Sequence, residues 1–271
     1  MAAGLLNCQS QLVVDSEYDE AVNELITAYA VPRRLREARV ADRLQSVEPQ
    51  RIACRWGDLS AWRLGTGPAV LLVHGFQDDN SLWSPLIDEL DRRGRGLVAF
   101  DLPAHGSSGG TWGVAFEGTD AIVAVAGALG PIDVVVAHSA GCGMAVGAIG
   151  EGWTVPRGVF VAPPLGQGDR WARYGERLGV SPKVVEAARS RYYAAHGPAR
   201  AAWQPRTAYT ALNLDLLVIH SRDDEHQPVS DSEAVIPLIP GATLELVDGL
   251  THRKTARDPA VVTRIADFIT A

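Results

Sequence analysis

The sequence predicts an α/β fold: a doubly wound, mostly parallel β-sheet with helices on both faces and a helical cap inserted between two strands. Two observations support this prediction. Short, strongly apolar runs alternate with amphipathic helical segments along most of the 271 residues, which is typical of a parallel sheet. The interval 165–213 breaks this alternation, because it has a helical pattern and no convincing strand.

We therefore divide the chain into three expected regions. Residues 1–50 form an N-terminal helical extension, residues 51–164 and 214–271 form the α/β core, and residues 165–213 form the helical cap over the site. In sheets of this kind, ligands bind at the carboxyl ends of the strands. The candidate site residues are therefore expected directly after strands.

Local patterns define the individual elements. An apolar stripe predicts a helix over 16–29, Asn80 is a typical helix-capping residue, and Gly94 is a typical helix-ending residue. The expected core elements are, in order, strands at 51–55, 60–64 and 69–73, a helix at 80–94, a strand at 96–100, a helix from Thr119 or Asp120 to Gly130-Pro131, a strand at 132–137, a small-residue helix to about residue 150, strands at 159–162, 214–219 and 243–247, and a last helix from Asp258-Pro259.

Composition excludes several classes of protein. The formal net charge of −7 argues against a nucleic-acid partner, which needs a basic surface. Cys8, Cys54 and Cys142 are too few for a disulfide framework or a zinc site and suit a reducing compartment. The first residues lack the features of a signal peptide, and no run of 18 apolar residues occurs. We expect a cytoplasmic protein without a membrane span.

The stretch AHSAGCG, residues 137–143, predicts a nucleophile. It follows an apolar strand and precedes a helix rich in small residues, so Ser139 sits at a sharp strand-to-helix turn. Such a turn exposes the serine hydroxyl and places the next backbone N–H at a helix N-terminus, where it can bind an oxyanion. The close approach of strand and helix requires small residues two positions on either side, here Ala137 and Gly141.

A serine nucleophile needs a base and a carboxylate that orients this base. The stretch HSRDDEHQP after the strand at 214–219 offers Asp223 and Asp224, and DGLTHRK after the strand at 243–247 offers His252. The chain order serine, aspartate, histidine is the one expected for this kind of sheet. The residues alone leave the choice between the two aspartates open.

Together these motifs resemble the α/β-hydrolase fold family over about residues 51–271. The stretches that carry the resemblance, beside the serine turn, are LLVHGF (71–76), DLPAHGSS (101–108), IHSRDDEHQP (219–228) and GLTHRKTARDP (249–259). Ala104 and Ser221 stand where the family usually has glycine. The resemblance selects Asp224 as the triad acid and implies an oxyanion hole formed by the backbone N–H groups of Phe76 and Ala140.

The function implied is that of a cofactor-free serine hydrolase that cleaves carboxylic esters through an acyl-enzyme on Ser139. A thioesterase, a lactonase and a C–C bond hydrolase would use the same three side chains, so these alternatives stay open. The alternative of another class is a non-catalytic ligand-binding protein on the same scaffold. The expected partner is a small-molecule ester or thioester.

Further residues have two interpretations each. His138 and the cap aromatics Trp171, Tyr174, Tyr192 and Trp203 are candidates for the wall of a substrate pocket, although lid aromatics also form the lid's own core. The excess of basic residues in the cap would attract an anionic substrate or simply face solvent. The helix at 16–29 would pack on its own domain or form a homo-oligomer interface.

The remaining polar motifs give no further site. His74 and His105 lie in turns and are expected to be structural, whereas His220 and His226 have no partner at metal-ligand spacing, so we expect no metal site. No G-x-G-x-x-G follows the first strands, and a nicotinamide cofactor is not expected.

Overall fold

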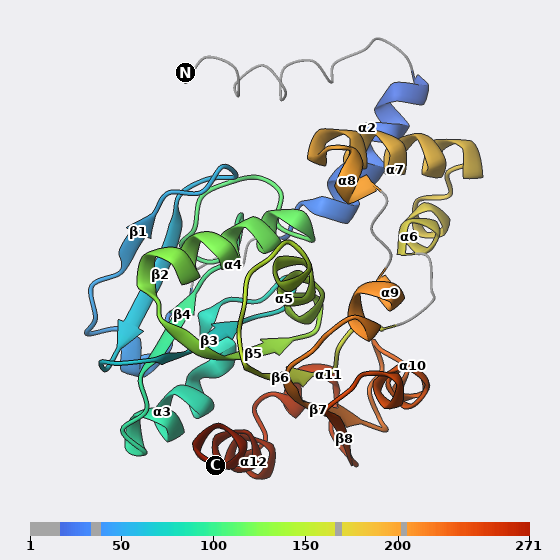
Figure 1. Cartoon of the computed structure of the whole chain (residues 1–271). Helices are drawn as coiled ribbons and strands as arrows, with labels where there is room; N and C mark the ends of the chain where they lie inside the picture. Colours follow the sequence, from blue (N-terminus) through green and yellow to red (C-terminus); the bar gives the residue numbers. More distant parts are fainter. Residues whose placement is uncertain (1–16, 34–38, 166–169, 202–204) are drawn as a thin grey trace. The chain divides into compact units, whose positions relative to one another are not determined.

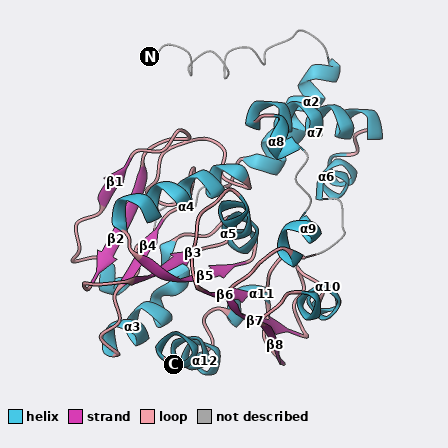
Figure 2. Cartoon of the chain, viewed as in Figure 1, coloured by secondary structure: helices cyan, strands magenta, loops and turns pink. Residues whose placement is uncertain are grey.

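The structure is a computed structural model that describes residues 17–33, 39–165, 170–201 and 205–271 (Figures 1 and 2). The chain divides into two compact units. One contains Met1–Val31 and Gly168–Trp203, and the other contains Pro32–Gln167 and Gln204–Ala271.

The smaller unit is helical and contains α2 (Glu17–Ala30), α6 (Arg170–Leu178), α7 (Pro182–His196) and α8 (Pro198–Ala201). The apolar stripe of α2 is buried, and α2 contacts both α6 and α7. The unit boundaries therefore differ from the expected ones. The N-terminal helix lies with the inserted helices rather than apart from them, and α9 (Pro205–Thr210) belongs to the larger unit.

Aromatic rings form the core of this helical unit. The ring of Tyr29 on α2 stacks on Trp171, with centroids 3.7 Å apart, and meets the edge of the Tyr192 ring at 5.3 Å. The guanidinium of Arg191 on α7 donates to Asp19 and Asn23 on α2. Packing between segments about 140 to 170 residues apart in the sequence therefore joins α2 to the insertion. The acidic residues that α2 adds to the unit are Glu17, Asp19, Glu20 and Glu24.

The larger unit is built on an eight-stranded sheet with the order β1-β2-β4-β3-β5-β6-β7-β8. The pairs β1–β2 and β2–β4 are antiparallel, and the other five pairs of this sheet are parallel. The strands are β1 (Gln50–Ile52), β2 (Leu59–Leu64), β3 (Ala69–Val73), β4 (Leu97–Phe100), β5 (Ile132–His138), β6 (Arg157–Val161), β7 (Asp215–Ser221) and β8 (Ala242–Val247). The predicted doubly wound, mostly parallel sheet is confirmed.

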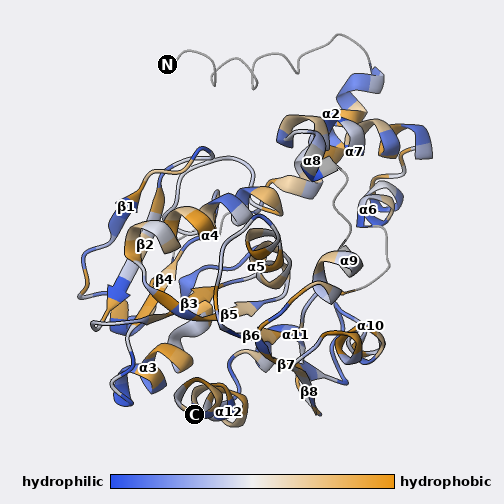
Figure 3. Ribbon diagram, in the orientation of Figure 1, coloured by the Kyte–Doolittle hydropathy of each residue, from blue (hydrophilic) through white to orange (hydrophobic). Residues whose placement is uncertain are grey.

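Helices cover both faces of this sheet (Figure 1). Because side chains alternate along a strand, Leu71 and Val73 of β3 join the core beneath α4 (Phe116–Leu129) and α5 (Ala140–Gly150), whereas Val70 and Leu72 join the core beneath α3 (Ser84–Arg92) and α12 (Pro259–Thr270). Figure 3 shows the hydrophobic colouring of β3 and β5 that this double burial requires. The remaining short helices are α10 (Val229–Val235) and α11 (His252–Thr255), with 3₁₀ turns η1 (Asp42–Leu44), η2 (Asn80–Trp83) and η3 (Ile236–Leu238).

Two helix starts differ from the sequence prediction. Asp79, not Asn80, caps η2, because its carboxylate accepts the backbone N–H of Ser81 while the Asn80 side chain donates to the Asp101 carboxylate. Helix α4 begins at Phe116, before the expected Thr119 or Asp120. Its first turn is buried, so tertiary packing rather than a capping side chain fixes where this helix begins. Among the helices of the described residues, none is long and apolar enough to cross a membrane.

Candidate active site

The predicted nucleophile turn joins β5 to α5. Ser139 has φ 51° and ψ −125°, a left-handed conformation that strains a residue with a side chain. Its backbone N–H donates to the carbonyl of Val161 on β6, which anchors the turn to the sheet. A Cβ at Gly141 would lie 2.5 Å from the His74 carbonyl oxygen, so only glycine fits there. Close packing of α5 against the end of β3 therefore explains the small residue two positions after the serine.

The three predicted catalytic side chains meet above the carboxyl ends of β5, β7 and β8. The Ser139 hydroxyl lies 2.8 Å from Nε2 of His252, and Nδ1 of His252 lies 2.7 Å from Oδ2 of Asp224. Both contacts are within hydrogen-bond range. The side chain of Asp224 is fully buried, while that of His252 is 12% exposed. The residues therefore form a continuous chain from a partly accessible hydroxyl to a buried carboxylate.

Asp224 is held by three hydrogen-bond donors and by a contact with a further imidazole. Its Oδ1 accepts the backbone N–H groups of His226 and Gln227, both at 2.8 Å, and its Oδ2 accepts from His252 and lies 3.4 Å from Nε2 of His220. Burial alone would raise the pKa of the Asp224 carboxyl, but these hydrogen bonds outweigh burial and hold the pKa well below its usual range. Asp224 is therefore an anion at neutral pH.

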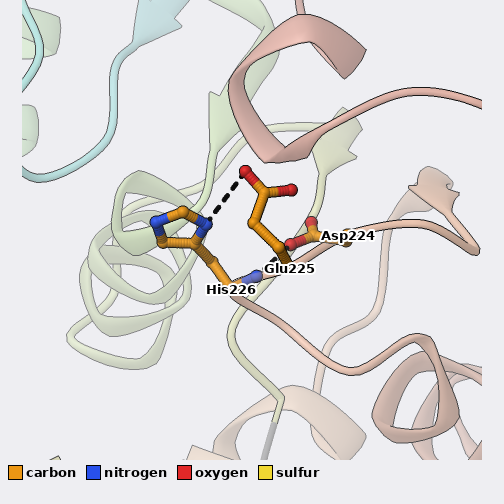
Figure 4. Close-up of side chains that lie close together, drawn as sticks. All are labelled: Asp224, Glu225 and His226. Atoms are coloured by element: carbon orange, nitrogen blue, oxygen red, sulfur yellow. Dashed lines mark hydrogen bonds and ion pairs between the residues drawn. The ribbon is translucent and has the colours of Figure 1, made fainter.

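The backbone of His252 is held on both sides. Its N–H donates to the carboxylate of Glu225 at 3.0 Å, and its carbonyl accepts from Nε2 of His138 at 3.2 Å. Two further imidazoles flank its ring, with centroids 4.7 Å away for His138 and 5.1 Å away for His226. Figure 4 shows the Glu225 carboxylate turned toward the His226 ring, 3.3 Å from its Nδ1. These contacts fix the position of the imidazole between Ser139 and Asp224.

The loop after β3 is anchored by its own set of contacts. Gln77 has φ 62°, and its N–H donates to Nε2 of the buried His105. His74 accepts the N–H of Leu102 in the same way. The carboxylate of Asp78 accepts two hydrogen bonds from the Arg253 guanidinium, at 2.7 and 2.8 Å. This bidentate ion pair connects the loop that contains Phe76 to the loop that contains His252.

Comparison with known proteins places this arrangement in a family. Residues 70–265 match the alpha/beta hydrolase family, which is more than half of the chain. The chain belongs to the alpha/beta hydrolase family. The resemblance found in the sequence motifs is confirmed, and no curated protein gives a significant match.

Solved structures share the fold of this alpha/beta hydrolase. An esterase of Pyrococcus furiosus is 19% identical, with a TM-score of 0.67 over 89% of this chain and 97% of its own. An esterase of Rhodococcus sp. ECU1013 is 19% identical, with a TM-score of 0.63 over 83% of this chain and 99% of its own. A thermophilic esterase of Thermogutta terrifontis is 20% identical, with a TM-score of 0.62 over 83% of this chain and 98% of its own.

The candidate pocket residues of this alpha/beta hydrolase lie in different places. His138 is only 3% exposed and lies against His252. Trp171 and Tyr192 are buried in the aromatic core of the helical unit, and Tyr174 meets the edge of the Tyr29 ring there. Trp203 lies outside the described residues. The role of all five in a substrate pocket stays a prediction.

Sequence reasoning missed the residues that support the predicted catalytic groups. Glu225 holds the backbone of His252, Asp78 holds Arg253, and His220 approaches Asp224. The only signal was position, since Glu225 and His220 lie within four residues of Asp224 and inside the motif that identified it. Side-chain direction in a loop decides which neighbours make contact, and residue type does not encode it.

Asp224, Glu225 and His226 also form a group of the kind that can hold a metal ion, with their ligand atoms within 4.8 Å of one another. Oδ1 of Asp224 already accepts two backbone N–H groups, Oδ2 accepts from His252 and lies 3.4 Å from His220, and Glu225 accepts the His252 N–H. The contacts of these three residues therefore indicate that they hold His252 in place.

Replacing His138 by glutamine should flatten the pH dependence of stability. Burial, followed by the nearby His252, lowers the pKa of His138 from 6.5 to about 3. The unfolded chain therefore binds a proton that the folded chain does not, and as pH falls from about 6.5 toward 3 this residue removes roughly 1.4 kcal/mol of unfolding free energy per pH unit. His138→Gln should lack this loss.

Urea unfolding between pH 7 and pH 5 measures the effect. His226→Gln, which replaces an exposed imidazole, serves as the matched control and should keep the wild-type slope. Equal slopes for His138→Gln and wild type would contradict the burial of a neutral imidazole at position 138.

Proposed function

We propose that this protein is a serine hydrolase that cleaves carboxylic esters through an acyl-enzyme on Ser139. The observation that carries the proposal is the hydrogen-bonded chain from Ser139 through His252 to Asp224, built at a strained strand-to-helix turn. A buried carboxylate with a strongly lowered pKa is the partner that an imidazole needs when it takes up a proton. Side chains and backbone supply every group that the proposed reaction requires.

The proposed reaction has two halves. In the first, Ser139 Oγ attacks the ester carbonyl while His252 Nε2 takes the hydroxyl proton and then delivers it to the leaving alcohol. In the second, His252 takes a proton from water, the hydroxide attacks the acyl-enzyme, and the proton returns to Ser139 as the acid leaves. Asp224 keeps the Nδ1–H tautomer of His252 and stabilises the imidazolium in both halves.

The proposed oxyanion hole consists of the backbone N–H groups of Phe76 and Ala140. Ala140 is the first residue of α5, so its N–H has no intrahelical acceptor and points along the positive end of the helix. The loop of Phe76 is fixed by the bond from Gln77 to His105 and by the pair of Asp78 with Arg253. A donor fixed in this way stabilises a developing negative charge without having to reorganise.

Hydrolysis of p-nitrophenyl esters from acetate to dodecanoate tests the proposal, together with covalent labelling by a fluorophosphonate probe. We expect saturable turnover and one label per chain, located on Ser139 by peptide mapping. The optimum acyl length measures the depth of the acyl site. Labelling without ester turnover would shift the substrate to a thioester, a lactone or a C–C bond, and absence of both would favour a ligand-binding protein.

A further inference from the structure

A second histidine lies on the other side of the Asp224 carboxylate. His220 is the next-to-last residue of β7, and its side chain is fully buried. Its Nδ1 is 2.7 Å from the hydroxyl of Ser232 on α10, and its Nε2 is 3.1 Å from the carbonyl oxygen of Gln227. The same Nε2 lies 3.4 Å from Oδ2 of Asp224. Every polar atom of this ring therefore has a partner.

These partners determine which nitrogen carries the proton. The Gln227 carbonyl and the Asp224 carboxylate accept hydrogen bonds and cannot donate them, so Nε2 of His220 must be protonated. A neutral imidazole then has its lone pair on Nδ1, and the Ser232 hydroxyl donates to it. The Gln227 carbonyl thus fixes the tautomer, and the Nε2–H that it holds also faces Asp224.

We propose that His220 is a positioning residue that, with its tautomer set by the Gln227 carbonyl, holds Asp224 in line with His252. This inference rests on the proposed function of Ser139, His252 and Asp224. The contact of 3.4 Å between His220 and Asp224 places five side chains in a row, in the order Ser139, His252, Asp224, His220 and Ser232.

The position of His220 in the fold explains why it is suited to this role. Asp224 lies on the loop after β7, whereas His220 lies within the strand and is paired with Leu246 of β8. A strand residue locked by its neighbours is a more rigid support than a loop. Without the His220 donor, one side of the Asp224 carboxylate would lose its support, and the carboxylate would attract a proton on His252 more strongly.

Loss of the His220 donor should therefore shift the pH dependence of kcat/KM in one direction. The groups that face the Asp224–His252 pair are His220 from β7, Glu225 and His226 from the following loop, and His138 from the end of β5. Loss of the His220 donor leaves the other three groups in place. The acid limb of the kcat/KM profile should therefore move to higher pH.

The test uses the full chain and three variants. His220→Phe removes the ring nitrogens at similar volume, His220→Gln restores an N–H donor near the Nε2 position, and Ser232→Ala removes the hydroxyl that contacts Nδ1. Thr119→Val is the matched control, because it removes a buried hydroxyl on α4 that donates to the Met144 carbonyl. Fluorophosphonate labelling rates, ester kinetics from pH 5 to 9, thermal unfolding, and ¹⁵N spectra of histidine-labelled protein are measured for each.

We expect His220→Phe to lower kcat by about ten- to a hundredfold, the range for loss of a hydrogen bond to a charged group, with little change in KM. His220→Gln should recover part of this loss, and Thr119→Val should match wild type. Equal kcat and an unshifted acid limb in a folded His220→Phe would overturn the proposal. Equal losses in the phenylalanine and glutamine variants would overturn it as well.

The ¹⁵N spectra separate this proposal from the proposed function. The ring of His220 should appear protonated at Nε2, and Ser232→Ala should shift its Nδ1 resonance. These signals do not depend on turnover, so an inactive wild-type protein with the expected tautomer would contradict the esterase proposal alone. A ring protonated at Nδ1 instead would overturn the role of His220, whether or not the protein turns over esters.

Discussion

An alanine at position 139 should lower kcat for ester hydrolysis by about 10⁵- to 10⁶-fold, the loss seen when the nucleophile of such a triad is removed. The Ser139 hydroxyl is the only group in the proposed reaction that forms a covalent bond to the acyl carbon. Without it, His252 can only assist the direct attack of water, and residual catalysis would come from the oxyanion hole and from binding. Fluorophosphonate labelling should disappear.

The fold should survive this substitution, because alanine keeps the backbone and loses one hydrogen bond to His252. Ser84→Ala is the matched control: it removes a hydroxyl that donates to the Ser81 carbonyl, and turnover should stay at the wild-type level. Wild-type turnover in a folded Ser139→Ala protein would rule out the nucleophile. The same outcome would rule out the acyl-enzyme.

Asp224→Asn should lower kcat by about 10⁴-fold. Both carboxylate oxygens of Asp224 accept hydrogen bonds, whereas an amide has one acceptor oxygen and one donor group. If the amide nitrogen takes the place of Oδ2, it donates to Nδ1 of His252. The proton of the imidazole then moves to Nε2, which can no longer accept the Ser139 proton. If the nitrogen takes the place of Oδ1, its hydrogens face the backbone N–H groups of His226 and Gln227. The two hydrogen bonds that these groups donate to Oδ1 are then lost.

Asp223→Asn is the matched control for this prediction, because the sequence alone left both aspartates as candidates. The Asp223 carboxylate accepts the backbone N–H of Gly249 at 2.6 Å, and its contact is with that loop rather than with the imidazole. Its loss should change kcat by less than about tenfold, within the range of an ordinary hydrogen bond. A large loss in Asp223→Asn with near-normal Asp224→Asn kinetics would reverse the assignment.

The parts of the site that follow from local pattern could be predicted from the sequence. Ser139 comes directly after an apolar strand, Asp224 and His252 lie within five residues of the ends of two others, and parallel strands bring their carboxyl ends together. The same reasoning predicted the order of strands and helices in the core. Local pattern is sufficient there because each element buries its own apolar face.

The parts that depend on distant contacts could not be predicted. Nothing in the run EYDEAVNELITAYA indicates that its buried stripe meets helices about 140 residues later, and the pairing of Tyr29 with Trp171 is visible only in the structure. The supports of the catalytic groups were missed for a related reason. His138 and His220 have the same residue type as structural histidines, and only the atoms opposite their ring nitrogens distinguish them.

The union of α2 with α6 and α7 has a consequence for the order in which the protein is made. Ribosomes add about 5–20 residues per second, so α2 leaves the ribosome on the order of 10–30 s before the helices that bury its apolar stripe. During that interval Val22, Leu25, Ile26 and Tyr29 lack their final partners, while the strands of the larger unit are already emerging. The helical unit is thus completed late in synthesis, and until then the apolar stripe of α2 lacks the helices that bury it.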